Sequence, residues 1–488
     1  MQKIFLAATD YIKKTEEIKC VQYFILLYFF IGTFLCFYAP TTGDEGDSIM
    51  HFMFPKYANK YPIHFFNQWA KPLFVFISFP FAKLGFTAFK CMNILFVTGA
   101  LWLVYKLALY FNFKRAWLPV VILASTPMFL TKALSGLTEP MFALALVWSV
   151  YLLLVKKQLN FSLIVFSFLP FIRSEGLLII GIILFYLLVN SVYNKIPLLF
   201  IGHVVYSILG YYFYHNFLWV FNTLSYTALS TSFGAGGEWL RFITKMNEIA
   251  GSANAILFYI SILYFLILTL KWLRQQTTLL EQQELLLIFG CVVIFIMGHT
   301  LFWALGIFNS GGIFRVMVGI FPLMALTSAR GLEYLFSCIN NKIWQKWFVI
   351  SSACLVFIYP FLGLDFSYRW QRDFDLNADQ KAQIILVDFL KTKYPDFKTK
   401  NMYYEPCYIA MLLNHNIFVH RELFSLTKNN IIKLKKGDLV IWDDWFAPTI
   451  QNVNRLNLDT NRNLKIIDSF IVKNFWNTPR TTLLYETK

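Results

Sequence analysis

Three carboxylates lie within four positions near the start of the chain, in the segment Gly43-Asp44-Glu45-Gly46-Asp47. Like charges this close together raise the pKa of at least one member of the group. A carboxylate with a raised pKa is suited to taking a proton from a hydroxyl group. A general base, a solvated turn and a cation site are therefore all compatible with this segment.

Three cations in apolar surroundings are candidates for binding a phosphate. Lys71 follows the apolar pair Trp69-Ala70, Arg173 lies between two apolar runs, and Arg315 is the only charged residue between positions 284 and 330. Arginine binds phosphate through a planar fork of donors, and lysine binds it as a point charge. The structural alternatives are that Lys71 reaches toward lipid headgroups and that Arg173 forms a local ion pair with Glu175.

Glu139 stands between Thr138 and Pro140, where two apolar segments meet. Thr138 could cap a helix that has Pro140 in its first turn, which accounts for Thr138 but only partly for Glu139. The histidines are scattered; His51 and His64 lie near the acidic segment, where a solvated or hydrogen-bonded role is the simpler interpretation. No Cys/His cluster predicts a structural metal site.

Most of the elements that must position these residues are predicted membrane helices. The 488 residues are 58% hydrophobic and 14% charged, whereas soluble domains are about 25% charged. The scarcity is uneven, because the first 370 residues hold 40 charged residues and the last 118 hold 30. A spanning helix needs about 20 apolar residues. Eleven segments are candidates: 21–39, 87–110, 116–131, 139–155, 159–173, 175–192, 196–215, 253–271, 284–305, 314–335 and 344–365.

The positive charges predict how these spans are oriented. Lys13, Lys14 and Lys19 precede the first span and place the N-terminus in the cytoplasm, and further lysines and arginines recur in every second gap. Eleven spans then place the C-terminal part on the exoplasmic side. The richness in Phe, Ile, Asn and Lys indicates a low-GC, bacterial genome, so we expect an inner (plasma) membrane protein with a periplasmic or extracellular C-terminal domain.

The predicted fold is an α-helical polytopic membrane protein with a small soluble α/β domain. Residues 1–365 form the membrane domain, whose first exoplasmic loop, 40–86, has juxtamembrane helices such as Pro72–Phe86. Residues 366–488 form the α/β domain. In it we expect a helix at Ala378–Lys393 and strands at Met402–Tyr404, Asn416–Val419, Leu439–Trp442, Lys465–Val472 and Thr482–Tyr485.

Taken together, these motifs resemble the polytopic glycosyltransferases of superfamily C (GT-C), in particular the group of protein O-mannosyltransferases and lipid A aminoarabinose transferases. The resemblance covers about residues 20–330 by order and topology. Its matching positions are Asp44-Glu45 after the first span, Lys71-Pro72-Leu73 before the second, Thr138-Glu139 opening the fourth, Arg173 to Gly176 opening a later hairpin, and Arg315 with Pro322 opening a late span. Two departures, Gly46-Asp47-Ser48 in place of an aromatic residue and Glu139 in place of an aspartate, leave the subfamily open.

The resemblance implies transfer of a sugar from a polyprenyl-phosphate donor to an exoplasmic acceptor by inverting displacement. The implied roles are catalytic for Asp44 and Glu45, donor-phosphate binding for Lys71, Arg173 and Arg315, and acceptor binding or a second acid for Glu139 and Asp47. The donor is already activated, so no cofactor is required; a divalent metal is compatible with this chemistry but not indicated. The implied partners are the donor lipid, a glycan, lipid or protein acceptor, and membrane lipids, with no nucleic acid.

Two other function classes fit the membrane architecture. A ligase or polymerase of lipid-linked glycans would use a diphosphate-linked donor and often Arg/His pairs in a large exoplasmic loop. The loop 216–252 has Arg241 and Lys245 but only His215 at its edge. A transporter or flippase would be expected to carry charges midway along its spans, where this sequence has almost none, and an inverted-repeat transporter would show paired halves.

Overall fold

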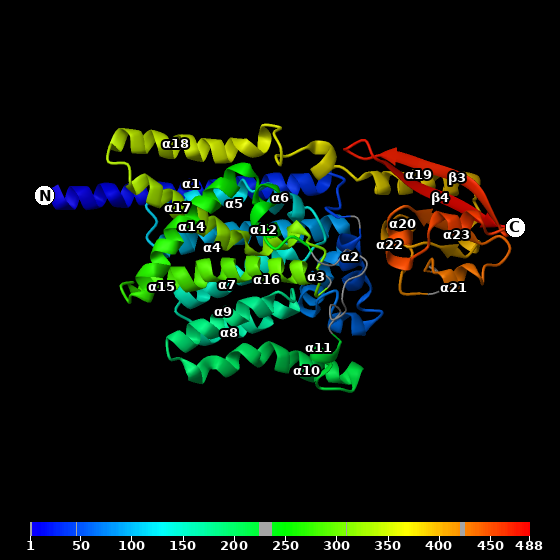
Figure 1. Ribbon diagram of the computed structural model, residues 1–488, viewed down its shortest axis with the longest axis horizontal. Helices are drawn as coiled ribbons and strands as arrows, with labels where there is room; N and C mark the ends of the chain where they lie inside the picture. Colours follow the sequence, from blue (N-terminus) through cyan, green and yellow to red (C-terminus); the bar gives the residue numbers. More distant parts are fainter. Residues whose placement is uncertain (1, 45, 224–236, 309, 420–424) are drawn as a thin grey trace.

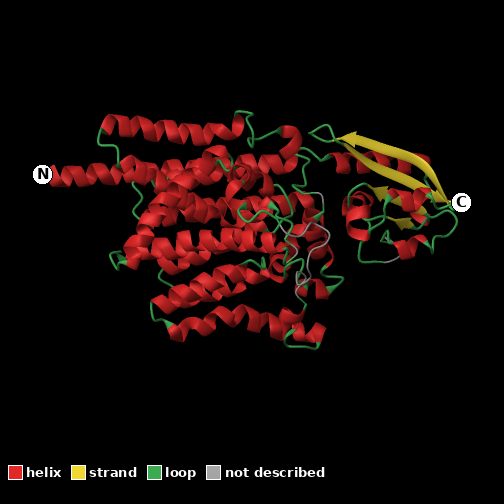
Figure 2. Ribbon diagram, in the orientation of Figure 1, coloured by secondary structure: helices red, strands yellow, loops and turns green. Residues whose placement is uncertain are grey.

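The computed structural model describes residues 2–44, 46–223, 237–308, 310–419 and 425–488. Figure 1 shows a bundle of helices lying side by side, with a small domain beyond one end, which we call the domain end. The N-terminus lies at the opposite end of the bundle. Figure 2 shows that the strands are confined to the small domain. The predicted division into a helical membrane part and an α/β domain therefore describes the architecture.

Seven of the described helices are long and apolar enough to cross a membrane, as judged by length and composition: Thr15–Tyr38, Phe86–Tyr110, Tyr193–Tyr214, Ser252–Leu273, Leu279–Leu305, Phe314–Ser337 and Lys342–Phe361. The other four predicted spans coincide with shorter helices: α5 (Leu118–Ala124) with α6 (Pro127–Ala133), α7 (Glu139–Leu154), α8 (Leu159–Phe168) and α9 (Gly176–Val189). The helix breaks before Pro127 because proline has no N–H to continue the hydrogen-bond ladder. The predicted fold class is confirmed.

Within the seven long spans the separate helices are α1 (Gln2–Tyr38), α4 (Phe86–Tyr110), η3 (Tyr193–Phe200), α10 (Ile201–Tyr214), α14 (Ser252–Leu273), α15 (Leu279–Gln283), η4 (Glu284–Phe289), α16 (Gly290–Leu305), η5 (Phe314–Ile320), α17 (Phe321–Ser337), α18 (Lys342–Ile358) and η6 (Tyr359–Phe361). In the apolar stretch of the span that includes α17, 89% of the residues are buried, so this span lies in the interior of the bundle. The spans of α1, α10 and α18 are only 22% buried, so their apolar side chains are left to face lipid.

The two long loops at the domain end contain short helices. The first holds α2 (Asp47–Tyr57), η1 (Pro62–Phe66) and α3 (Pro72–Leu84), so the expected juxtamembrane helix is present. The second holds α11 (Trp219–Asn222), α12 (Arg241–Thr244) and α13 (Met246–Ala250). Most of the glycine-rich part of the second loop lies outside the described residues.

The C-terminal domain is a four-stranded sheet in the order β1-β2-β4-β3. Its strands are β1 (Met402–Tyr403), β2 (Leu439–Asp443), β3 (Leu464–Lys473) and β4 (Pro479–Thr487); β1 is parallel to β2, and β4 is antiparallel to both its neighbours. Its helices are η7 (Trp370–Phe374), α19 (Ala378–Lys393), η8 (Phe397–Thr399), α20 (Cys407–Leu413), α21 (Lys428–Ile431), α22 (Phe446–Gln451) and α23 (Arg455–Asp459). Side chains of β2 alternate between two apolar cores, one on each face of the sheet. The predicted helix and four of the predicted strands are confirmed.

The prediction of a strand at Asn416–Val419 is wrong, because this segment is a turn. Phe418 packs its ring against Phe54 and His64 of the first loop, with ring centroids 5.0 and 4.1 Å apart. The side-chain oxygen of Asn416 accepts a hydrogen bond from the Phe418 N–H at 3.1 Å, which stabilises the turn. The apolar residues of this segment therefore dock the domain onto the membrane part.

The position of the N-terminus, at the end of the bundle remote from the domain (Figure 1), fits an odd number of spans. Alkaline phosphatase needs an oxidising compartment for its disulfides. Fused after Lys488 it should therefore be active, and fused after Ile339, in the turn between α17 and α18, it should be inactive. The opposite pattern of activity would contradict the predicted orientation.

Candidate active site

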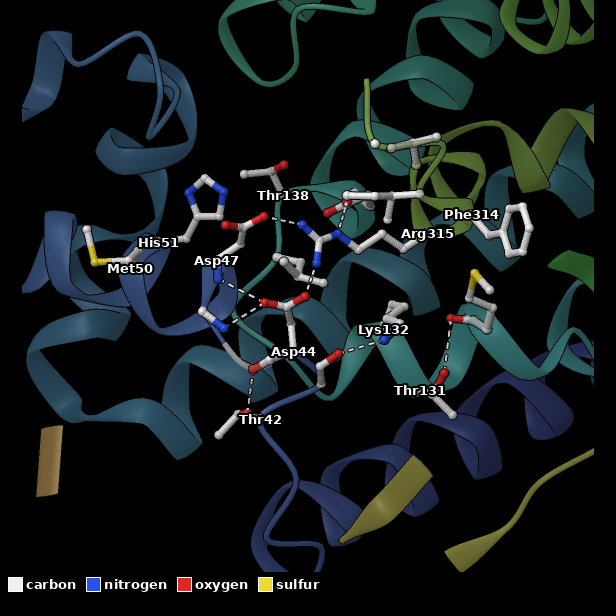
Figure 3. Close-up of a pocket in the computed structure, with 18 of the residues that line it drawn as sticks. Thr42, Asp44, Asp47, Met50, His51, Thr131, Lys132, Thr138, Phe314 and Arg315 are labelled. Atoms are coloured by element: carbon white, nitrogen blue, oxygen red, sulfur yellow. Dashed lines mark hydrogen bonds and ion pairs between the residues drawn. The ribbon is translucent and has the colours of Figure 1, made fainter. Parts of the chain in front are cut away.

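A cavity of about 1690 Å³ lies at the domain end, between the bundle and the C-terminal domain. Both parts of the chain contribute side chains to its wall. It brings together six of the seven predicted site residues: Asp44, Asp47, Lys71, Glu139, Arg173 and Arg315. The seventh, Glu45, lies outside the described residues. Figure 3 shows Asp44 and Asp47, from one short segment, pointing toward Arg315, which comes from a distant part of the chain.

Arg315 lies in contact with several of the acidic side chains. It lies in η5, and its two terminal nitrogens contact a carboxylate oxygen of Asp44 and one of Asp47. Its Nε lies 3.5 Å from Oε1 of Glu139. A guanidinium presents several donors in one plane, so one arginine can hold several carboxylates in fixed directions. The acidic segment is therefore part of a buried charge cluster and not merely a solvated turn.

The turn that carries Asp44 is held at both ends. The Oδ1 of Asp44 accepts hydrogen bonds from the N–H groups of Gly46, at 2.9 Å, and Asp47, at 2.8 Å. Lys132 donates to the carbonyl of Gly43 at 2.6 Å. Gly43 has a φ of +73°, and a Cβ there would lie 2.4 Å from the Cβ of Ser135, so only glycine fits. With Oδ1 occupied by the turn, Oδ2 of Asp44 is directed to Arg315.

Glu139 is shared by two arginines. It is the first residue of α7 and its side chain is 1% exposed. Its Oε1 lies 2.8 Å from Nη1 of Arg173 and 3.5 Å from Arg315, whereas its Oε2 has no hydrogen-bond partner among the described residues. Thr138 makes no side-chain cap on α7; its hydroxyl accepts a hydrogen bond from Arg173 at 2.9 Å instead. The capping explanation for this segment is therefore wrong.

Arg173 and Lys71 form the other side of the cluster. Arg173 makes the expected local pair with Glu175, at 2.7 Å, while it also lines the cavity. The ammonium of Lys71 donates to the hydroxyl of Ser174 at 2.7 Å. Lys71 is buried and has a φ of +69°, an unusual conformation for a residue other than glycine. Strain of this kind persists only where the surroundings hold the residue in place, and it is common at ligand sites.

Burial shifts the ionisation of two loop residues in this cluster. It raises the pKa of Asp47 to about 6; repulsion from Glu139 adds to the rise and Arg173 opposes it. The Asp47 side chain lines the cavity and is 46% exposed. Burial lowers the pKa of Lys71 to about 8, with Glu175 opposing the fall and Arg173 adding to it. Both groups can therefore change charge within two pH units of neutrality.

Three further residues line the cavity. The sequence did not single out Lys132 and Ser174, and it suggested a simpler role for His51. His51 is buried and stacks on Trp69, with ring centroids 4.6 Å apart. Burial, with Arg173 and Lys71 adding, lowers the pKa of His51 to about 3, which keeps it neutral. Lys132 and Ser174 also line the cavity. Lys132 has a recognisable signal, because an ionisable residue at the end of an apolar segment is a functional candidate. Among the described residues, no group of three or more His, Cys, Asp or Glu is placed to hold a metal ion.

The comparisons with known proteins identify a fold. No family model matches the sequence, and no curated protein matches it. The crystal structure of ArnT from Cupriavidus metallidurans bound to undecaprenyl phosphate is similar, with a TM-score of 0.62, 10% identity, and coverage of 96% of this chain and 98% of that chain. The apo structure of the same protein gives a TM-score of 0.60, 9% identity and coverage of 97% and 98%.

ArnT is a lipid A aminoarabinose transferase, a GT-C glycosyltransferase. At such low identity the likeness shows the fold, and it confirms the architecture that the sequence resemblance implied. The coverage of 96% includes most of the C-terminal domain, for which the sequence showed no resemblance.

Replacing Glu139 by alanine should destabilise the protein strongly, because two guanidinium groups lose the carboxylate they share. Breaking a buried ion pair in this way costs about 3–5 kcal/mol. Glu248→Ala is the matched control, since Glu248 pairs with Lys245 at 2.9 Å where the two side chains are 30% and 42% exposed; its loss should leave the midpoint close to that of the wild type. Thermal unfolding in detergent measures both variants. Similar midpoints for the two would contradict the central role of Glu139.

Proposed function

We propose that this protein transfers a sugar from a polyprenyl-phosphate donor to an acceptor at the exoplasmic face of a bacterial inner membrane. The observation that carries the proposal is the cavity itself, in which Lys71, Arg173 and Arg315 converge and Asp44 is in direct contact with Arg315. The fold supports it, because a solved structure with this fold contains undecaprenyl phosphate.

The donor lipid would enter from the side of α9 and α16. There the cavity wall includes the apolar side chains Leu177, Leu178 and Phe302. A polyprenyl chain lying against these side chains would place its phosphate near Lys71, whose neighbour Ser174 is only two residues before α9. An apolar wall leading to a few convergent charges is the usual form of a site for an amphipathic ligand.

Phosphate binding would have to change the existing ion pairs. Arg315 is held by Asp44, Asp47 and Glu139. A phosphate that takes donors from Arg315 must displace some of these carboxylates, and like-charge repulsion then favours protonation of one of them. Asp47 is suited to this, because its raised pKa of about 6 makes protonation inexpensive near neutral pH. A phosphate that takes both terminal nitrogens of Arg315 would displace Asp47, which is then protonated, and also Asp44, which stays charged.

The released Asp44 would act as general base. The acceptor oxygen attacks the anomeric carbon as its proton passes to Asp44, and the bond between that carbon and the phosphate oxygen breaks with inversion. The leaving polyprenyl phosphate gains negative charge, which Lys71, Arg173 and Arg315 would stabilise in the transition state. Asp47 would serve as the second acid, and Glu139 would hold the two arginines in place. The donor supplies the activated bond, so no cofactor is needed.

Asp44→Asn should abolish most of the transfer activity while leaving the fold intact, because the amide keeps the hydrogen bonds of the turn but cannot take a proton. We expect kcat to fall by about 10²–10⁴-fold, measured as sugar transfer from a polyprenyl-phosphate donor at unchanged expression. Binding of undecaprenyl phosphate should be retained, since the variant releases Arg315 from one carboxylate. Activity near wild type would exclude Asp44 as the base.

The lowered pKa of Lys71 predicts how the affinity for the donor depends on pH. Its pKa of about 8 means that it is charged below pH 8 and neutral above it. The donor KM should therefore rise more steeply above about pH 8 than between pH 6.5 and 7.5, where only the proton that Asp47 takes up on binding contributes. In Lys71→Arg the additional rise above pH 8 should disappear, because a guanidinium stays charged. A KM that is flat in the wild type, or one that rises equally in both proteins, would contradict phosphate binding by Lys71.

A further inference from the structure

The C-terminal domain covers the cavity and directs aromatic side chains into it. Trp445 and Phe446 lie at the start of α22, and Trp476 lies in the turn between β3 and β4; all three line the same cavity as Asp44. We propose that they form the acceptor-binding surface and that the acceptor is an uncharged carbohydrate unit. This inference rests on the proposed function, because it assumes that a sugar is transferred in this cavity.

The aromatic surface lies directly beside the acidic segment. A Cβ built on Gly46 would meet the ring of Phe446 at 3.1 Å. The thiol of Cys407, the first residue of α20, donates to the carbonyl of Gly46 at 3.4 Å. Gly46 is the neighbour of Asp47 and is bonded through its N–H to Asp44. A ligand resting on Phe446 would therefore lie next to the proposed base.

The segment that carries Trp445 and Phe446 is held in place without a ligand. Asp443, 1% exposed at the end of β2, accepts hydrogen bonds from the N–H groups of Trp445, at 2.9 Å, Phe446, and Ala447, at 3.3 Å. The guanidinium of Arg480 lies 5.6 Å from the centre of the Trp445 ring, within range of a cation–π contact. A segment that is already ordered loses little entropy on binding, which favours a recognition surface.

The charges around this surface favour an uncharged ligand. The domain residues that line the cavity include three carboxylates, from Asp373, Asp375 and Glu405, and one cation, Arg372. Asp373 pairs with Arg372 at 2.8 Å and Asp375 with Lys381 at 2.6 Å, so the charges on this side are nearly balanced. The one cation among the described domain residues of the wall is already paired and offers little to an anionic acceptor, whereas the cations that suit a phosphate lie on the membrane side. Carboxylates are also strong acceptors for hydroxyl groups. The acceptor side of the cavity thus combines aromatic faces with hydrogen-bond acceptors.

A carbohydrate fits this combination better than a peptide. A sugar ring has an apolar C–H face, which can lie on an aromatic ring, and a rim of hydroxyl donors. A peptide commonly binds by adding a strand to a sheet edge, but no residue of β1–β4, all of which the structure describes, lines the cavity. Trp445 is 39% exposed and Trp476 70% exposed, so both offer apolar surface to a ligand.

The experiment uses cells of the organism that encodes this protein, after deletion of its gene. The deleted gene is then replaced by the full-length wild-type gene or by a variant. The cells are pulsed with a radiolabelled monosaccharide that enters the polyprenyl-phosphate pool, and label is measured in that pool, in glycan and in protease-sensitive protein. Trp445→Ala and Trp476→Ala should each lower labelled glycan by about tenfold, the loss expected for one aromatic anchor. Leu456→Ala, an exposed apolar residue of α23 in the same domain but outside the cavity wall, is the control and should match the wild type.

Purified Trp445→Ala and Trp476→Ala should still gain thermal stability from undecaprenyl phosphate as the wild type does, which shows that they fold and that the loss concerns the acceptor. Label that passes to protease-sensitive protein, or variants that label glycan like the wild type, would overturn the acceptor assignment and leave sugar transfer standing. If the protein consumes the donor, labelled polyprenyl-phosphate sugar should accumulate in cells without the gene. No such accumulation would overturn the proposed function itself.

Discussion

The structure depends on one buried carboxylate that two guanidinium groups share. Glu139, at the start of α7, bridges Arg173 from the connection between α8 and α9 and Arg315 from η5. Unpaired charges are expensive at the edge of a membrane, so three distant segments are tied together at the same level of the bundle. Arg315 extends the network to Asp44 and Asp47, and through them to the first loop. The charges that could bind a substrate are thus also those that assemble the cavity.

The cavity has two chemically different sides. Cations from the membrane part face apolar helices on one side, and aromatic rings of the C-terminal domain stand among carboxylates on the other. Asp44 lies between these two sides. Its carboxylate contacts Arg315 and also accepts a hydrogen bond from Gly46, which lies beside the ring of Phe446. This arrangement would let a lipid phosphate and a sugar hydroxyl approach one carboxylate from opposite directions. It also gives the C-terminal domain a role, since without it one side of the cavity would be missing.

Much of this could be predicted from the sequence, because apolar runs and isolated charges are local signals. All eleven predicted apolar segments are helical, and α19 has its predicted bounds. The pairing of Arg315 with Asp44 could not be predicted, because 271 positions separate them. Asn416–Val419 has the pattern of a strand, yet Phe418 packs on the first loop, which only the tertiary structure determines. Trp445 and Trp476 gave no signal, because an aromatic residue in a soluble domain usually belongs to a core.

The central claim is that Lys71, Arg173 and Arg315 together form the site for a lipid phosphate. It is tested most directly by an experimental structure of the full-length protein with undecaprenyl phosphate. The account predicts phosphate oxygens at hydrogen-bond distance, about 3 Å, from all three cations, with Arg315 turned away from Asp44. A phosphate bound outside this cluster, or Arg315 still paired with Asp44 and Asp47 when the lipid is bound, would contradict it.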